Sequence, residues 1–316
     1  MFKKTADSVL AIDLAPDSVR VLDVRFRKGQ PQVQAFANQS VSAGGVETLP
    51  ERHLEALGSL ISTHRMKARQ CFAAMPTNLV VTRSVAVDPG KPQPPEEQVR
   101  WTLQNCIPFD PRDLIFDYWP SGNPSSTTRT KDMLVVASQA SVVRRYLAGF
   151  EKLRLTCAHL DVAPCAVASL IARLVSASDA IVGTVALTET GGYFAIVERQ
   201  RVLFWRPFEL PTNKGAANSP AAMDRVGDEI SKCVSHMVGS MQVDHMAELL
   251  MFGNGADDAN FSDYLHTRFH LPVRSPSPFD SLPPDAMSPE VRAAVQPAVA
   301  THFAAAVGLA MQPAGV

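Results

Sequence analysis

The chain has 316 residues, of which 46% are hydrophobic and 19% are charged, and its formal net charge is -1. This composition is that of a globular protein, which excludes a disordered chain, and the balanced charge excludes the basic surface typical of nucleic-acid binding. The length is large for a single core and predicts two domains, or one fold with two lobes.

The sequence pattern carries no signal for secretion or for crossing a membrane. Lys3 and Lys4 precede the apolar run Val9 to Ile12, but Asp7 and Asp13 bracket that run and leave it too short for a signal peptide. No stretch of about 18 apolar residues occurs. The five cysteines form no CxxC pair and fit a reducing compartment. We therefore expect a cytoplasmic protein that reaches a membrane only through a partner.

The first part of the chain predicts three strands, a helix and a fourth strand. Val9 to Val24 contains two β-branched strands joined by a turn at Ala15-Pro16-Asp17. Gln32 to Val41 alternates like a third strand, Leu49 to Met66 has apolar residues at helical spacing, and Gln70 to Met75 is a short buried strand. Together these segments predict one α/β unit.

A small inserted module with the order β-α-β-β-α follows this unit. Its predicted elements are a strand at Thr77 to Val87, a helix at Glu96 to Cys106, strands at Leu114 to Trp119 and Met133 to Ala137, and a helix at Ser141 to Leu153 that Ser141 caps. The proline-rich segment Pro89 to Pro95 breaks the chain inside the module, and Pro95 with two acidic residues begins its first helix.

The second half repeats the order of the first. The predicted elements are a strand at His159 to Val162, a helix at Cys165 to Leu174, strands at Val182 to Thr188, Gly192 to Val197 and Val202 to Pro207, a helix at Ala222 to Met241, a strand at Leu249 to Phe252, a helix at Phe261 to Phe269, and alanine-rich helices within Pro289 to Met311. We place the turn of the second hairpin at Gly191-Gly192. Two such halves predict a two-lobed actin-like, ribonuclease-H-like α/β fold, with lobes at 1–160 and 161–316 and the inserted module at about 77–155.

The first hairpin is the candidate phosphate loop. Asp13 closes the first strand, so its carboxylate is expected beside the backbone N–H groups of the turn, where a metal–phosphate ligand is held in such hairpins. In the second hairpin the strand ends at Thr188, and Glu189 points to the opposite face. An ordinary hairpin with a polar tip is the alternative for both.

Two further motifs have both a nucleotide and a structural interpretation. Gly253-Asn254-Gly255 lies between a strand and a helix, where glycine lets the backbone approach an adenosine, or merely supplies a positive φ. Glu229 and Lys232 are spaced i, i+3 on a helix and are either nucleotide contacts or a solvated ion pair. The histidines lack metal-ligand spacing, so we assign no histidine metal site.

These patterns occur within stretches that resemble the PilM family, the actin-like proteins of type IV pilus assembly, whose relatives include FtsA and the cytoplasmic domain of GspL. The stretches are VLAIDLAPDSVRVLDV, PPEEQVRWTLQNCIPFDPRDLIFDY, DMLVVASQASVVRRYLAGFEKLRLTCAHLDVAPCAVASL, DEISKCVSHMVGSM, LLMFGNGADDANFSDYL and AAAVGLAM. Together they span nearly the whole chain in order.

The resemblance implies ATP with Mg²⁺ as the cofactor. It assigns Asp13, Ser18 and Arg20 to the first phosphate loop, with Asp13 facing the metal. It assigns Glu229 and Lys232 to the base and sugar, and Gly253, Asn254 and Gly255 to the adenosine loop.

Two departures from the family pattern argue against ATP hydrolysis. Ala15-Pro16 replaces a glycine-serine, and Thr188-Glu189-Thr190 replaces the aspartate-x-glycine of the second phosphate loop. Losing the carboxylate that aligns Mg²⁺ and water removes much of phosphoryl-transfer catalysis. The expectation is a scaffold with a degenerate nucleotide cleft.

The resemblance also implies a partner, the short cytoplasmic N-terminal peptide of PilN, docked between the first lobe and the inserted module. Ile107, Phe109, Phe116 and Tyr118 are the candidate contacts, and packing inside the module is the alternative for each. We expect a scaffold of the inner-membrane assembly platform, which could extend to the platform's ATPases. The alternatives are an active actin-like ATPase, in which Glu189 supplies the carboxylate after a shift of register by one, and a role like that of GspL or FtsA in secretion or division.

Overall fold

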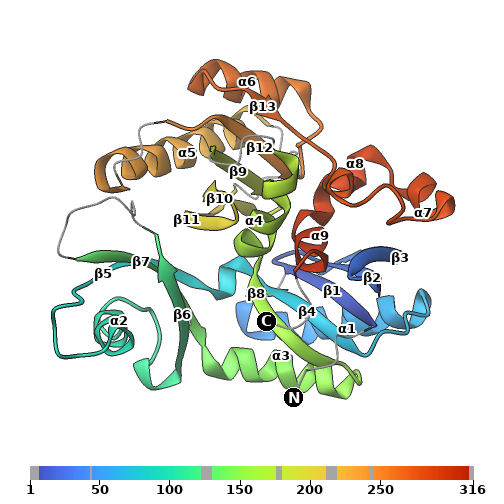
Figure 1. Cartoon of the computed structure of the whole chain (residues 1–316), viewed down its shortest axis with the longest axis horizontal. Coiled ribbons are helices and arrows are strands. Elements are labelled where there is room, and N and C mark those ends of the chain that lie inside the picture. Colours follow the sequence, from blue (N-terminus) through green and yellow to red (C-terminus); the bar gives the residue numbers. More distant parts are fainter. Residues whose placement is uncertain are drawn as a thin grey trace.

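The computed structural model describes residues 7–42, 45–121, 130–175, 180–210, 219–241 and 245–312. It contains two five-stranded sheets of matching topology (Figure 1), with strand orders β3-β2-β1-β4-β8 and β11-β10-β9-β12-β13. In each sheet the first three strands form antiparallel pairs and the later strands add in parallel. This repetition confirms the two-lobed α/β architecture and the internal duplication.

The strands follow the predicted segments closely. Their bounds are β1 Ser8–Ala15, β2 Ser18–Arg27, β3 Gln30–Ser40, β4 Gln70–Met75, β5 Val81–Val87, β6 Leu114–Pro120, β7 Lys131–Gln139, β8 Thr156–Val162, β9 Ile181–Leu187, β10 Gly191–Glu198, β11 Arg201–Glu209, β12 Glu248–Gly253 and β13 Val273–Arg274. Strand β1 is buried along all but its first residue, as expected for a central strand covered on both faces.

The helices lie in three layers around the two sheets. Their bounds are α1 Leu49–Thr63, α2 Pro95–Leu103, α3 Ala140–Lys152, α4 Ala163–Leu174, α5 Pro220–Met241, α6 Ala259–Phe269, α7 Pro289–Ala294, α8 Pro297–Ala300 and α9 Ala304–Ala310. Short 3₁₀ turns are η1 Val46–Thr48, η2 Thr77–Leu79, η3 Pro111–Asp113, η4 Pro278–Ser281 and η5 Thr301–Phe303. Helices α1 and α3 cover the outer side of the first sheet, and α5 and α6 cover that of the second.

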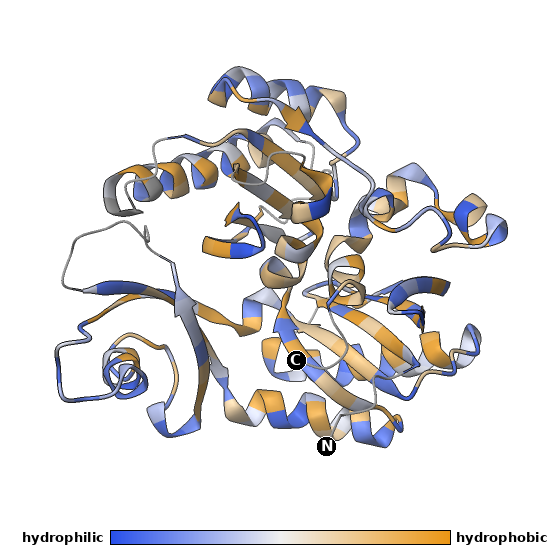
Figure 2. Ribbon diagram, in the orientation of Figure 1, coloured by the Kyte–Doolittle hydropathy of each residue, from blue (hydrophilic) through white to orange (hydrophobic). Residues whose placement is uncertain are grey.

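Helices α4 and α9 lie between the two sheets and join them into one core. Helix α9 packs on α4 and on β1, β2 and β4 of the first sheet, whereas α4 also contacts β10 and β11 of the second. The C-terminal helix thus returns to the first lobe, which corrects the simple division at 160/161. In Figure 2 the inner layers are mostly hydrophobic, whereas the outer helices carry both hydrophilic and hydrophobic residues. No helix among the described residues is long and apolar enough to cross a membrane.

The inserted module has its own small core, but it is narrower than predicted. Its sheet has the order β5-β7-β6, and α2 packs on it through Val99 and Leu103. Helix α3 instead adds Tyr146 and Phe150 to the core of the first lobe. Ser141 does not cap α3, because its hydroxyl and its backbone N–H both donate to the carboxylate of Asp113.

The crossing of α4 and α9 allows almost no space between the two backbones. Gly308 on α9 is so close to α4 that an added Cβ would lie 2.0 Å from the carbonyl oxygen of Ala166. Both helices carry small residues at this crossing, with Ala163 and Ala166 on α4 and Ala304 and Ala305 on α9. The glycine therefore sets how closely the two helices, and with them the two sheets, approach.

We predict that Gly308→Ala lowers the free energy of unfolding by about 1–3 kcal/mol, because the methyl group forces α9 away from α4. The matched control is Gly239→Ala on α5, where nothing lies within 4 Å of the added Cβ. That change should be neutral or stabilising by up to about 1 kcal/mol, since alanine favours the helix. Urea denaturation followed by circular dichroism measures both, and equal effects would contradict this account of the crossing.

Candidate functional site

The first hairpin places a buried ion pair at the junction of the lobes. Strands β1 and β2 are joined by Pro16 and Asp17, and this register puts Asp13 directly opposite Arg20. Arg20 donates from Nη1 to Oδ2 of Asp13 at 2.9 Å, and both side chains are buried. Burial raises the pKa of the Asp13 carboxyl, and the neighbouring guanidinium opposes that rise. The cation next to Asp13 is thus an arginine of the same hairpin.

The second hairpin supplies no carboxylate to this junction. Strand β9 ends at Leu187, and Thr188 closes the turn through its N–H and hydroxyl, which both donate to the carbonyl of Gly191. Glu189 is exposed at the tip. Gly191 and Gly192 begin β10 instead of forming the turn. Glycine is needed at both positions, because an added Cβ would lie 2.4 Å from the carbonyl oxygen of a neighbouring strand.

The two hairpins meet directly, tip to tip. The Oδ2 atom of Asp17 accepts a hydrogen bond of 2.6 Å from the backbone N–H of Glu189, and its Oδ1 accepts one of 2.9 Å from the hydroxyl of Ser18. A carboxylate of the first hairpin therefore lies against the backbone of the second. Backbone amides at such a tip are what a phosphate group contacts when hairpins of this kind hold one.

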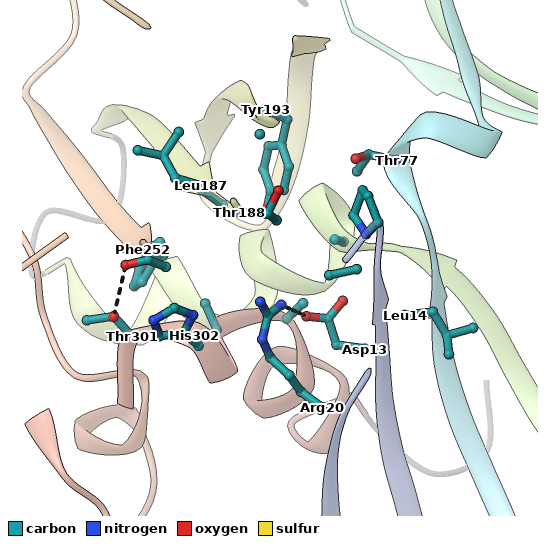
Figure 3. A pocket seen from close by; sticks show the side chains of 18 of the residues that line it. Asp13, Leu14, Arg20, Thr77, Leu187, Thr188, Tyr193, Phe252, Thr301 and His302 are labelled. Atoms are coloured by element: carbon teal, nitrogen blue, oxygen red, sulfur yellow. Dashed lines mark hydrogen bonds and ion pairs between the residues drawn. The ribbon is translucent and has the colours of Figure 1, made fainter. Parts of the chain in front are cut away.

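Two hollows border the hairpins: one of about 570 Å³ at the tips, beside Asp17 and Glu189, and a much smaller one beside the buried pair Asp13 and Arg20. The small cavity has a volume of about 40 Å³ and is bordered by Asp13, Arg20, Thr188, Tyr193 and His302, among others (Figure 3). That is on the order of the volume of a single water molecule, whereas small-molecule sites occupy roughly 300–1,000 Å³. Among the described residues no group of three or more His, Cys, Asp or Glu could hold a metal. The cavity beside Asp13 and Arg20 therefore has no room for a metal–nucleotide complex.

The adenosine loop predicted at Gly253 has the expected backbone. Gly253 and Gly255 have φ of +80° and +75°, and an added Cβ at Gly253 would lie 2.0 Å from the carbonyl oxygen of Leu187. The N–H of Asn254 donates to the same carbonyl at 3.0 Å. Gly253 borders the cavity together with Asp13 and Arg20. The structure therefore brings together the two loops that the sequence singled out.

The predicted pair Glu229 and Lys232 lies outside the small cavity beside Asp13. Both residues are on α5, beside strand β11 at the opposite edge of the second sheet. Glu229 is only 2% exposed and is surrounded by Lys232 at 2.8 Å, Arg225 at 3.0 Å and Arg206 at 3.5 Å. Glu229 and Lys232 thus form the ion pair that was one of the two expectations, but Glu229 is buried and is shared by three cations.

The four partner candidates fall into two groups. Phe116 and Tyr118 stack on each other at 6.3 Å and pack against the module core, and Arg100 lies over the Phe116 ring. This placement favours packing over peptide contact for both. Ile107 borders a groove that faces the second lobe, and Phe109 is half-buried two residues further on.

Three residues of the site were not singled out in the sequence: Asp17 at the hairpin tip, and Tyr193 and His302, which border the small cavity. Asp17 was interpreted only as a turn former, because its partner lies 172 residues away. Tyr193 is buried, and burial raises the pKa of its hydroxyl. Burial and the charge of Arg20 lower the pKa of His302. A signal for Tyr193 was available, since alternation along β10 places it on the inner face of its sheet.

A buried histidine forms a hydrogen bond with the backbone of the first hairpin. His53 on α1 contacts the carbonyl oxygen of Ala15 through Nε2 at 2.9 Å and the Tyr146 hydroxyl through Nδ1 at 2.7 Å. Because the carbonyl only accepts, Nε2 carries the proton and Nδ1 accepts from Tyr146. Burial is the main reason that the pKa of His53 falls to about 4. The neutral ring therefore ties the tip of the hairpin to helices α1 and α3.

We predict a histidine contribution to the pH dependence of stability. Between pH 6.5 and pH 4 the unfolded chain binds a proton at His53 and the folded chain does not, so the free energy of unfolding falls as the pH is lowered through this range. The contribution is at most about 3 kcal/mol. His53→Gln should reduce the difference in unfolding free energy between pH 7 and pH 4.5, and His64→Gln, at the exposed end of α1, should not. The same pH dependence in wild type and His53→Gln would contradict the assignment.

Comparison with known proteins identifies similar chains. The family model described as "Type IV pilus assembly protein PilM" matches residues 11–214, well over half of the chain. A solved structure described as the PilM–PilN type IV pilus biogenesis complex aligns with a TM-score of 0.80 at 18% identity, covering 99% of this chain and 100% of that chain.

Two further solved structures are similar at greater distance. One is the cytoplasmic domain of EpsL, an inner-membrane component of the type II secretion system of Vibrio cholerae, with a TM-score of 0.50, 13% identity and coverage of 78% and 82% of the two chains. The other is a protein of unknown function with an actin-like ATPase fold from Bacteroides thetaiotaomicron, with a TM-score of 0.54, 9% identity and coverage of 89% and 96%. At such identities these likenesses establish the actin-like fold.

Proposed function

The chain belongs to the PilM family of type IV pilus assembly proteins, and we propose that it is an adaptor that binds the N-terminal cytoplasmic peptide of PilN. The observation that carries the proposal is the family match, joined to the agreement over the full chain with the structure of a PilM–PilN complex. In this role the protein lies in the cytoplasm beneath the inner membrane and is held there by its partner. Through PilN it would be associated with the assembly platform and, through the platform, with its ATPases.

The nucleotide cleft of this adaptor is degenerate. A bound nucleotide and its metal would bring a negative and a positive charge to this cleft, and side chains of the chain itself supply one of each. Arg20 neutralises Asp13, and the Asp17 carboxylate contacts the amide of Glu189 at the second tip. Displacing Arg20 from Asp13 would leave a buried charge unpaired, which is costly in a site of low dielectric. The lobes are therefore held together without a nucleotide.

The peptide site is assigned to the end of α2. Ile107 and Phe109 follow α2 and are only partly buried, so each presents apolar surface next to the module. Their neighbour Trp101 on α2 is 71% exposed, which adds a large apolar side chain to the same module. Partly exposed apolar residues on one small module suit capture of a short peptide through side-chain pockets.

We expect isothermal titration calorimetry to detect binding of a synthetic PilN N-terminal peptide, taken from the genome that encodes this chain. Phe109→Ala should weaken the binding about tenfold, because it removes apolar contact area from the proposed site. A peptide of the same composition in scrambled order is the control. Folded protein that gives no binding heat with the native peptide, at several temperatures, would remove the proposal.

We also expect no phosphate release from ATP above background in the presence of Mg²⁺. The matched variant is Asp13→Asn with Arg20→Gln, which removes both charges of the buried pair and so leaves no unpaired ion. Wild type and variant should give the same rate in a phosphate-release assay. The alternative, an active actin-like ATPase, predicts brisk release by the wild type that the double variant abolishes while its circular dichroism stays native.

A further inference from the structure

A further, larger hollow lies between the inserted module and the second lobe. This groove has a volume of about 970 Å³, compared with about 40 Å³ for the small cavity beside Asp13. One wall is the segment 80–84, which contains the start of β5, and the other is 204–207 on β11. The segment 105–108 and helix α5 border the rest of the groove. We call it the β5–β11 groove. It neither includes Asp13 nor touches the adenosine loop, so it is separate from the degenerate cleft.

The side chains that border the groove give it a positive charge. Arg83, Arg206 and Lys232 line it, and none of the described residues that line it is acidic. Arg83 donates to the backbone carbonyls of Thr82 and Cys106, which carry no net charge, so these contacts leave its positive charge uncancelled. The side chains of Arg206 and Lys232 are each about half exposed. The electrostatic complement of this surface is an anionic ligand.

Glu229 holds two of these cations in place without cancelling them. Its buried carboxylate contacts Arg206, Lys232 and also Arg225, so one negative charge faces three positive ones. Ion pairing to a buried anchor restricts the rotamers of the cations, which lowers the entropy lost when they bind an anion. The cluster is therefore organised before any ligand arrives.

The backbone in the walls favours an extended chain as the ligand. Strand β5 is at the edge of the module sheet, and β11 is at the edge of the second large sheet (Figure 1). The two edges approach at one point, where the Thr82 hydroxyl donates to the carbonyl of Trp205 at 3.3 Å. Edge strands carry unpaired N–H and C=O groups that can pair with an added strand. Ile107 and Phe204, which are both partly exposed, add apolar surface for alternate side chains.

We propose that the β5–β11 groove binds an extended acidic segment of a partner protein, in which acidic residues alternate with apolar ones. The strand edges pair with the backbone of the segment, the apolar residues of the groove accept every second side chain, and Arg83, Arg206 and Lys232 pair with its carboxylates. The proposal does not rest on PilN, since charge and strand edges alone define the ligand.

The test is to pan a library of random peptides, displayed on phage, against the purified full chain at low ionic strength. The enriched peptides should carry a net negative charge with alternating apolar residues. The synthetic consensus peptide, measured by fluorescence anisotropy, should bind about tenfold more weakly to a variant with Arg83→Glu and Lys232→Gln, and more weakly to wild type as salt is raised. These changes leave Glu229 paired with Arg206 and Arg225.

The control variant is Arg27→Glu with Lys28→Gln, which makes the same change of three charges at exposed residues at the end of β2, outside the groove. It should bind the consensus peptide as wild type does. The proposal is overturned if no peptide is enriched, if the enriched peptides are neutral or basic, or if the groove variant binds like the control. It is also overturned if sedimentation shows that a second copy of the chain occupies the groove and that the groove variant disperses the dimer.

Discussion

The close crossing of α4 and α9 is the constraint on which the rest of the structure depends. Each large sheet packs one face on this pair of helices, and the glycine and alanines at the crossing let the two sheets approach across it. Because the hairpins are the ends of central strands, the separation of the sheets also sets the separation of their tips. The hydrogen bond from Glu189 to Asp17 is possible only at that separation.

The charges in the cleft support the proposal that closure needs no ligand. In a nucleotide-binding cleft the hairpin amides and the strand-end carboxylate face phosphate and metal, which bring charges of opposite sign into one site. Here Arg20 and Asp17 bring a positive and a negative charge to comparable places. Both are on β2 or its turn, so the first hairpin alone supplies them. The neutral His53 beneath Ala15 adds no third charge to this balance.

Local sequence predicted the elements well and the contacts between them less well. The hairpin of β1 and β2 follows from β-branched alternation around Pro16, and the two-residue turn then implies that Asp13 opposes Arg20. The placement of α9 in the first lobe could not be predicted, because its apolar faces are compatible with either sheet. The surroundings of Glu229 could not be predicted for a similar reason: spacing on α5 shows that it shares a face with Lys232, but not that this face lies against β11.

The same tertiary contacts give the small cavity beside Asp13 and the β5–β11 groove different chemistry. In the cleft every charged side chain that borders the small cavity has a partner within the chain, and burial makes exchange of those partners costly. In the groove the cations exceed the one buried carboxylate and remain half exposed, so an incoming anion gains contacts without breaking a buried pair. If the chain acts as the proposed adaptor, its binding surface must be ordered before the partner arrives and must still have charges left to pair. The edge of β11 with α5 meets both conditions, whereas the buried pair of the first hairpin meets only the first.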